Sequence, residues 1–151
     1  MTRRQTMPEQ WLIIGTRLDK ALWSAVRTLK RRSGVLVISD LAPKDRRRLR
    51  QLARLRGFTV VVEETGAAAR VHNLRELRQA LLRRTPLILL SPLYRTRSHP
   101  DWPPLPRMRA AALARLAKRT ALALGGMDAR RFRQDRRLGF VGWAGISAFR
   151  I

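Results

Sequence analysis

The sequence has no cysteine, only two histidines and only ten acidic residues among its 151 positions. The missing cysteine excludes disulfide frameworks, thiolate zinc sites and cysteine nucleophiles, and it is compatible with the reducing cytoplasm in which we expect the protein. We see no Ser-His-Asp arrangement, pair of catalytic carboxylates or metal-binding cluster. Near the N-terminus only four apolar residues, "WLII", stand together before Gly15, too few for a signal-peptide core or a membrane span, so no membrane insertion is expected.

Basic residues are abundant instead: 33 lysines and arginines give a formal net charge of +23, and 29 of the 33 are arginine. The arginines are spread over every predicted helix, at 46–56, 75–84, 107–119 and 130–137. A dedicated nucleic-acid surface usually concentrates its charge on one face and adds aromatic side chains. The spread favours solvated helix faces and only non-specific attraction of nucleic acid, while a basic nucleic-acid-binding protein remains an alternative.

Short apolar runs alternate with amphipathic basic segments along the whole chain, and 45% of the residues are apolar. This length and composition predict one domain over residues 1–151 with a substantial core. Strands are expected to begin near residues 11, 35, 59, 70, 86, 121 and 141, with helices between most of them. Pro43 suits a first helical turn, Gly57 a helix end and Asn73 a helix cap. The alternation predicts an α/β protein with a mainly parallel, helix-covered sheet.

One interval is too short for that pattern. Only "TGAAA" separates Glu64 from Arg70, whereas a parallel crossover normally needs a dozen or more residues. A complete eight-unit TIM barrel also takes about 250 residues. We therefore expect a shortened TIM-type barrel of about seven strands, with one or two βα units reduced or missing after the third strand. An open sheet would expose an edge, which a second copy of the chain in a homodimer would cover.

In parallel α/β folds, ligands bind beyond the carboxyl ends of the strands. Three expected strand ends carry residues suited to an anion, namely Thr96, Arg97, Ser98 and His99 in one loop, Gly125 and Gly126 in the next, and Gly145 to Ala148 in the last. Bare glycine backbone approaches an anion closely, and the helix that follows Gly126 is expected to add its dipole. These ends together predict a phosphate site.

Three segments in this order resemble the C-terminal half of thiamine phosphate synthases and their thiazole tautomerase (TenI) relatives: "SPLYRTRSHP" (91–100), "ALGGM" (123–127) and "GFVGWAGISA" (139–148). The resemblance covers roughly Arg70 to Ala148. It implies a (β/α)8 barrel that joins a hydroxymethylpyrimidine diphosphate to a thiazole phosphate and releases pyrophosphate, a step of thiamine biosynthesis. Pro92 stands where the similar tautomerases place their functional histidine, so the resemblance is closer to the synthases.

The same resemblance assigns roles to individual residues. The thiazole phosphate is expected at Thr96, Arg97, Ser98, Gly126, Ile146 and Ser147. The implied partners are phosphorylated small-molecule substrates. This assignment agrees with the phosphate site predicted from the strand ends.

The chain departs from the family where the pyrimidine diphosphate is held. His99 replaces a lysine, Arg70 replaces a serine, and "VISD" (37–40) replaces a glutamine–arginine–lysine motif. Mg²⁺ is possible by resemblance, but its usual aspartate ligands are absent because the chain passes from "VVVEET" directly to "ARVHN". Asp40, Glu63 and Glu64 are the substitutes that the sequence offers.

Three functional hypotheses follow. The first is a thiamine phosphate synthase-type transferase in which His99 and Arg70 are candidate catalytic groups, because the leaving pyrophosphate must be neutralised by cations or metal. The second is a catalytically degenerate relative that binds a phosphorylated ligand as a regulator or sensor. The third is the nucleic-acid-binding protein suggested by the charge.

Overall fold

A computed structural model describes residues 6–15, 17–118 and 120–149. Within these residues seven strands form one sheet in which every pairing is parallel. The strands are β1 (Gln10–Ile14), β2 (Gly34–Val37), β3 (Thr59–Val62), β4 (Ala68–Val71), β5 (Leu87–Leu90), β6 (Ala121–Leu124) and β7 (Gly142–Gly145). Each begins within two residues of its predicted start.

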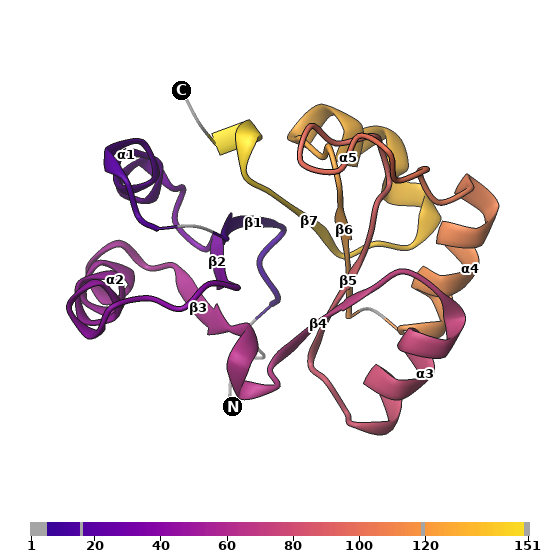
Figure 1. Ribbon diagram of the computed structural model, residues 1–151, viewed down its shortest axis with the longest axis horizontal. Coiled ribbons are helices and arrows are strands. Elements are labelled where there is room, and N and C mark those ends of the chain that lie inside the picture. The colour runs from indigo at the N-terminus through magenta and orange to yellow at the C-terminus, as the bar shows by residue number, and fades with distance from the viewer. Residues whose placement is uncertain (1–5, 16, 119, 150–151) are drawn as a thin grey trace.

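The sheet has the strand order β3-β2-β1-β7-β6-β5-β4 and is curled (Figure 1). Neighbours in the chain are therefore neighbours in the sheet everywhere except between β3 and β4, and β7 pairs with β1 as in a closed barrel. The architecture is a shortened barrel of the TIM type that is open at one place. The predicted fold class and the predicted position of the missing unit are both confirmed.

The opening lies where the sequence interval is short. β3 and β4 are the two edges of the sheet, and the segment between them holds one 3-10 turn, η1 (Glu63–Thr65), followed by Gly66 with a left-handed φ of 78°. Because β3 and β4 do not pair, this connection needs no helix-length crossover. The oligomeric state that would cover these edges stays a prediction.

The helices cover the outside of the sheet (Figure 1). They are α1 (Lys20–Thr28), α2 (Pro43–Arg56), α3 (Leu74–Leu82), α4 (Arg107–Leu116) and α5 (Ala129–Asp135), with single 3-10 turns η2 (Arg136–Leu138) and η3 (Ser147–Phe149). The three predicted end signals are confirmed: Pro43 is in the first turn of α2, Gly57 ends it at φ 75°, and the Asn73 side chain caps α3 by accepting the N–H of Glu76. Among the described residues no helix is long and apolar enough to cross a membrane.

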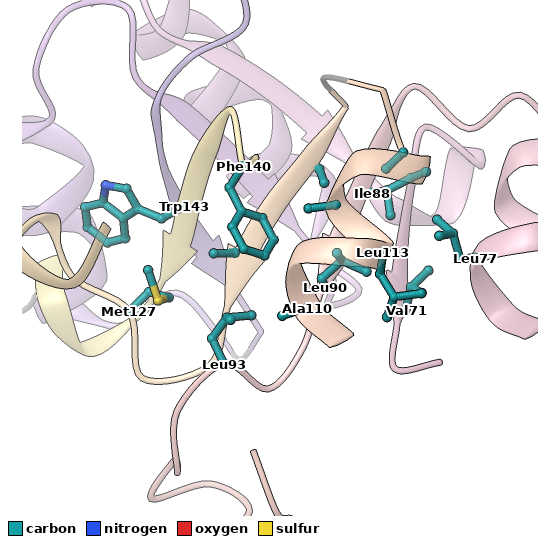
Figure 2. Close-up of a cluster of buried hydrophobic side chains, with 14 of the residues drawn as sticks. Val71, Leu77, Ile88, Leu90, Leu93, Ala110, Leu113, Met127, Phe140 and Trp143 are labelled. Atoms are coloured by element: carbon teal, nitrogen blue, oxygen red, sulfur yellow. The ribbon is translucent and has the colours of Figure 1, made fainter. Parts of the chain in front are cut away.

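The core has an inner part and two outer parts. Strand residues such as Trp11, Leu36 and Leu122 pack against one another inside the curled sheet. One outer cluster packs α1 and α2 against β1–β3, and the other packs α3, α4 and α5 against β4–β7 (Figure 2). Strands buried on both faces have continuous apolar runs, which explains why these strands were readable in the sequence.

Candidate functional site

The segments after β5, β6 and β7 lie side by side, and we call residues 91–98, 125–127 and 145–147 the glycine rim. Hydrogen bonding continues past the strands, because the N–H of Leu93 donates to the Leu124 carbonyl at 2.9 Å and the N–H of Tyr94 to the Gly125 carbonyl at 3.1 Å. A Cβ added to Gly145 would lie 3.2 Å from the Met127 carbonyl oxygen. The three strand ends that the sequence singled out therefore come together.

Both glycines after β6 are required by their surroundings. Gly125 has a φ of 102° and Gly126 a φ of 60°, which is left-handed backbone that favours glycine. A Cβ on Gly125 would lie 2.8 Å from the Cα of Pro92, and one on Gly126 would lie 2.9 Å from the carbonyl oxygen of Arg95. The N–H of Gly126 has no acceptor in the part of the chain that the structure describes. It is therefore a candidate donor to an anion.

The helix after Gly126 begins with a capping carboxylate. α5 has seven residues, and its N-terminal N–H of Arg131 is already bonded at 2.8 Å to the side chain of Asp128. A carboxylate at this position satisfies the helix end and opposes a second anion there. The expected dipole contribution therefore stays a prediction, and the Gly126 amide is a second candidate donor on this side.

A buried carboxylate fixes the loop after β5. Asp135 is 1% exposed, accepts a 2.6 Å hydrogen bond from the Tyr94 hydroxyl and pairs with Arg107 at 2.7 Å. Burial, followed by the hydrogen bond to Asp135, raises the pKa of Tyr94. The loop is thus joined to α5 and to the start of α4. Sequence reasoning missed this contact, because 41 positions separate the two side chains and no short motif connects them.

Arg131 is the second residue that sequence reasoning missed. Its guanidinium lies over the Tyr94 ring, 4.2 Å from the ring centroid, and donates to the Gly126 carbonyl. It is one of 29 arginines, so no sequence signal distinguished it. The structure places this cation in contact with the glycine rim.

The polar loop itself is partly turned toward β4. The Thr96 hydroxyl accepts the N–H of His99 at 3.0 Å, while Arg97 and Ser98 are exposed. The His99 ring stacks on Trp102 at 4.0 Å between centroids, and Trp102 meets the edge of His72 directly after β4. Thr96 therefore comes directly after Arg95, whose carbonyl oxygen lies close to Gly126. His99 is instead held by its stacking contact with Trp102.

His72, the other histidine, takes part in local hydrogen bonding at the start of α3. Its ring Nδ1 lies 2.9 Å from Glu76, and its N–H also donates to Glu76. Burial raises the pKa of Glu76, but the hydrogen bonds and charge of His72 outweigh it, so the pKa lies below its usual value.

The remaining predicted phosphate residues follow β7. Ile146 packs against the inner core and Ser147 begins η3. The side chain of Ser147 lies outside the described part of the structure. Their role in binding phosphate stays a prediction.

On the other side of the barrel the acidic residues are paired, and we call Asp40, Arg46, Glu63, Glu64 and Arg70 the ion-pair rim. Arg46 contacts Asp40 at 3.0 Å and Glu64 at 3.5 Å. Arg70 binds Glu63 through two hydrogen bonds of 2.8 and 3.2 Å. This bidentate pair connects η1 to β4 at the opening of the barrel. Arg70, a candidate catalytic cation, is thus engaged by a carboxylate.

These residues do not fit Mg²⁺. No group of three or more histidine, aspartate or glutamate side chains suited to a metal ion occurs among the described residues. The three proposed substitutes, Asp40, Glu63 and Glu64, each face an arginine whose positive charge disfavours a cation. We derive no step through a metal.

A cavity of about 680 Å³ lies at the opposite, amino-terminal end of the sheet. Its walls include Met7, Trp11, Val61 and Leu87, with Arg32 as the charged residue. The glycine rim lies at the carboxyl ends of the strands, where ligands bind in parallel α/β folds, so it and not this cavity is the candidate site.

A scan against models of known protein families finds no match to this sequence, and no curated protein matches it. A solved structure does match: thiamine phosphate pyrophosphorylase from Pyrococcus furiosus, with a TM-score of 0.72 over 95% of this chain and 88% of that chain. The chain has a thiamine phosphate synthase-like fold. Since the two sequences are 18% identical, the likeness shows the fold alone, and the site residues of this synthase-like chain stay predictions.

Proposed function

We propose that this synthase-like protein binds a phosphorylated small molecule at the glycine rim, with thiazole phosphate as the first ligand to test. The observation that carries the proposal is the convergence of three strand ends around Gly126 and Met127. The N–H of Gly126 has no acceptor among the described residues, and the Cα side of this glycine leaves no room for a Cβ. Close packing of bare backbone with a free donor is how many phosphate sites are built.

The neighbouring loop adds donors for the phosphate oxygens. The Thr96 hydroxyl accepts from His99, so its own O–H is left to donate. Arg97 and Ser98 are exposed in the same loop and supply a positive charge and a second hydroxyl. Ile146 and Ser147 would close the site from the side of β7.

Calorimetric titration with thiazole phosphate and with the corresponding thiazole alcohol tests this proposal. Because the proposed contacts are made to the phosphate, the ester should bind at least about 100-fold more tightly than the alcohol, as two or more charge-assisted hydrogen bonds would produce. Equal affinities for the two ligands, or no binding of the ester, would contradict the proposal.

The synthase reaction is the second candidate, favoured by the fold likeness over 95% of the chain to a thiamine phosphate pyrophosphorylase. In this reaction the thiazole nitrogen bonds to the pyrimidine methylene carbon while the C–O bond to the diphosphate breaks and pyrophosphate leaves. The leaving group needs cations. Arg70 is paired with Glu63 and His99 is stacked on Trp102, so neither candidate is poised for that work.

We therefore expect thiazole phosphate binding with little or no turnover, as in a regulator or sensor. The test supplies both thiamine precursors with Mg²⁺ and quantifies thiamine phosphate. Rapid product formation would show that the protein is a working synthase, and it would contradict the expectation drawn from the paired acids. Binding without product would favour the non-catalytic relative.

A further inference from the structure

Arg131 differs from the arginines of the ion-pair rim in having no acidic partner. It is partly buried, yet no carboxylate in the described part of the chain forms an ion pair with it. Two acids near it in the chain are engaged elsewhere: Asp128, the N-cap of α5, accepts the backbone N–H of Arg131, and Asp135 holds Tyr94 and Arg107. A partly buried cation without a counter-ion carries a desolvation cost that a bound anion offsets.

The position of the Arg131 side chain is fixed by two contacts. The guanidinium lies over the Tyr94 ring, and its Nη1 donates to the Gly126 carbonyl. Tyr94 is itself held by its hydrogen bond to buried Asp135. A guanidinium has five N–H donors, so four remain after the Gly126 contact. The cation is thus preorganised and keeps most of its donors.

The same cation contacts Gly126, the residue whose backbone N–H has no acceptor among the described residues. The Cβ position of Gly126 is 3.1 Å from Nη1 of Arg131, which places the guanidinium against the Cα of the residue whose N–H is unpartnered. We propose that Arg131 is the charged phosphate-binding residue of this site and makes it selective for dianionic phosphate monoesters. This assignment rests on the proposed function, because it concerns the same phosphate.

The chemistry explains the selectivity. A backbone N–H binds monoanions and dianions alike, whereas a planar guanidinium binds two oxygens of one phosphate and gains most from a doubly charged group. A phosphate monoester has its second pKa near 6, so it becomes a dianion as the pH rises through about 6. Sulfate is a dianion across this range and provides a ligand whose charge does not change.

The experiment compares Arg131→Gln with Arg130→Gln, which removes the same charge from an exposed neighbour on α5. Titration uses inorganic phosphate, sulfate and thiazole phosphate. Arg131→Gln should weaken thiazole phosphate binding about 10- to 100-fold, and Arg130→Gln less than about 2-fold. Wild-type affinity for phosphate relative to sulfate should rise between pH 5 and 7.5, and this rise should be much smaller in Arg131→Gln.

Equal losses in the two variants would overturn the assignment, because they would show only a general effect of charge. Wild-type affinity in Arg131→Gln would overturn it as well, while leaving phosphate binding at the glycine rim intact. If the wild-type chain binds none of the three anions, the proposed function fails first. If circular dichroism shows that Arg131→Gln is not folded, Arg131→Lys takes its place, because it keeps the positive charge but loses the planar, bidentate guanidinium. Arg131→Lys should bind thiazole phosphate roughly 3- to 10-fold more weakly than wild type.

Discussion

The two sides of the carboxyl-terminal end of this barrel use arginine in opposite ways. On the ion-pair rim, Arg46 and Arg70 are paired with all three nearby acids. On the glycine rim, Arg131 has no carboxylate partner among the described residues and donates to the carbonyl of Gly126. The charges of Arg46 and Arg70 are neutralised by carboxylates of the chain. The charge of Arg131 is not neutralised by any described carboxylate, and the proposed ligand would neutralise it. This difference is the reason for proposing an anion site on the glycine rim.

The shortening of the barrel accounts for the contrast. Between β3 and β4 one 3-10 turn replaces at least one βα unit, and the Glu63–Arg70 pair connects that turn to β4. Glu63, directly after β3, and Arg70, in β4, therefore bind each other across this opening. β5, β6 and β7 keep their neighbours on both sides, so their ends keep the converging geometry of a complete barrel.

The largest expected effect is on stability and comes from the support of the glycine rim. Asp135→Ala removes a 1% exposed carboxylate together with its hydrogen bond to Tyr94 and its ion pair with Arg107. We expect a loss of about 2–3 kcal/mol in the free energy of unfolding, measured by urea denaturation. A loss below about 0.5 kcal/mol would mean that this network does not hold the loop.

Alanine substitutions at Gly66 and Gly126 distinguish the cost of backbone strain from the cost of steric crowding. Gly66 and Gly126 both have left-handed φ values, but a Cβ at Gly66 meets nothing within 4 Å, whereas one at Gly126 meets Arg95, Tyr94 and Arg131. Both alanine variants should lose about 1 kcal/mol of stability from strain, and Gly126→Ala should lose about 1 kcal/mol more. Only Gly126→Ala should also weaken thiazole phosphate binding, by about 10-fold or more. Equal binding by the two variants would argue against the site.

Tyr94 is the single tyrosine of the chain, and its pKa depends on its burial and directly on its contact with Asp135. Its pKa in the folded protein should lie above 10.0, and ultraviolet absorbance of the tyrosinate should show the midpoint return to about 10.0 in denaturant. Because the folded pKa is raised, this group's contribution to stability is present below pH 10 and is lost as the pH rises above it. Asp135→Asn should lower the folded midpoint, since it removes the adjacent negative charge. An unchanged midpoint would show that Asp135 does not raise the pKa of Tyr94.

The smallest effect is expected on the ion-pair rim. Asp40 and Glu64 are largely exposed, and Glu63→Gln breaks one half-exposed pair with Arg70. The loss of unfolding free energy should be about 0.5–1 kcal/mol at low salt and should shrink in 1 M salt, because exposed pairs are screened. A loss as large as that of Asp135→Ala would reverse the contrast between the two rims.

Sequence reasoning predicted the fold better than the details of the site. Strands buried on both faces appear as apolar runs, and the five residues between Glu64 and Arg70 located the missing unit. The convergence of the strand ends followed from parallel topology. Tyr94, Asp135 and Arg131 were missed because their contacts depend on tertiary packing. The cap that Asp128 forms at the start of α5 was also not predicted.

The most direct test of the account is calorimetric titration of the wild-type protein with thiazole phosphate in the presence and absence of Mg²⁺. The proposed phosphate site consists of Gly126 and Arg131, and the described residues include no group of acids suited to a metal ion. The same affinity, within about 2-fold, is therefore predicted under both conditions. Binding that requires Mg²⁺ and is abolished by Glu63→Gln would contradict this prediction, because the anion would then depend on the ion-pair rim.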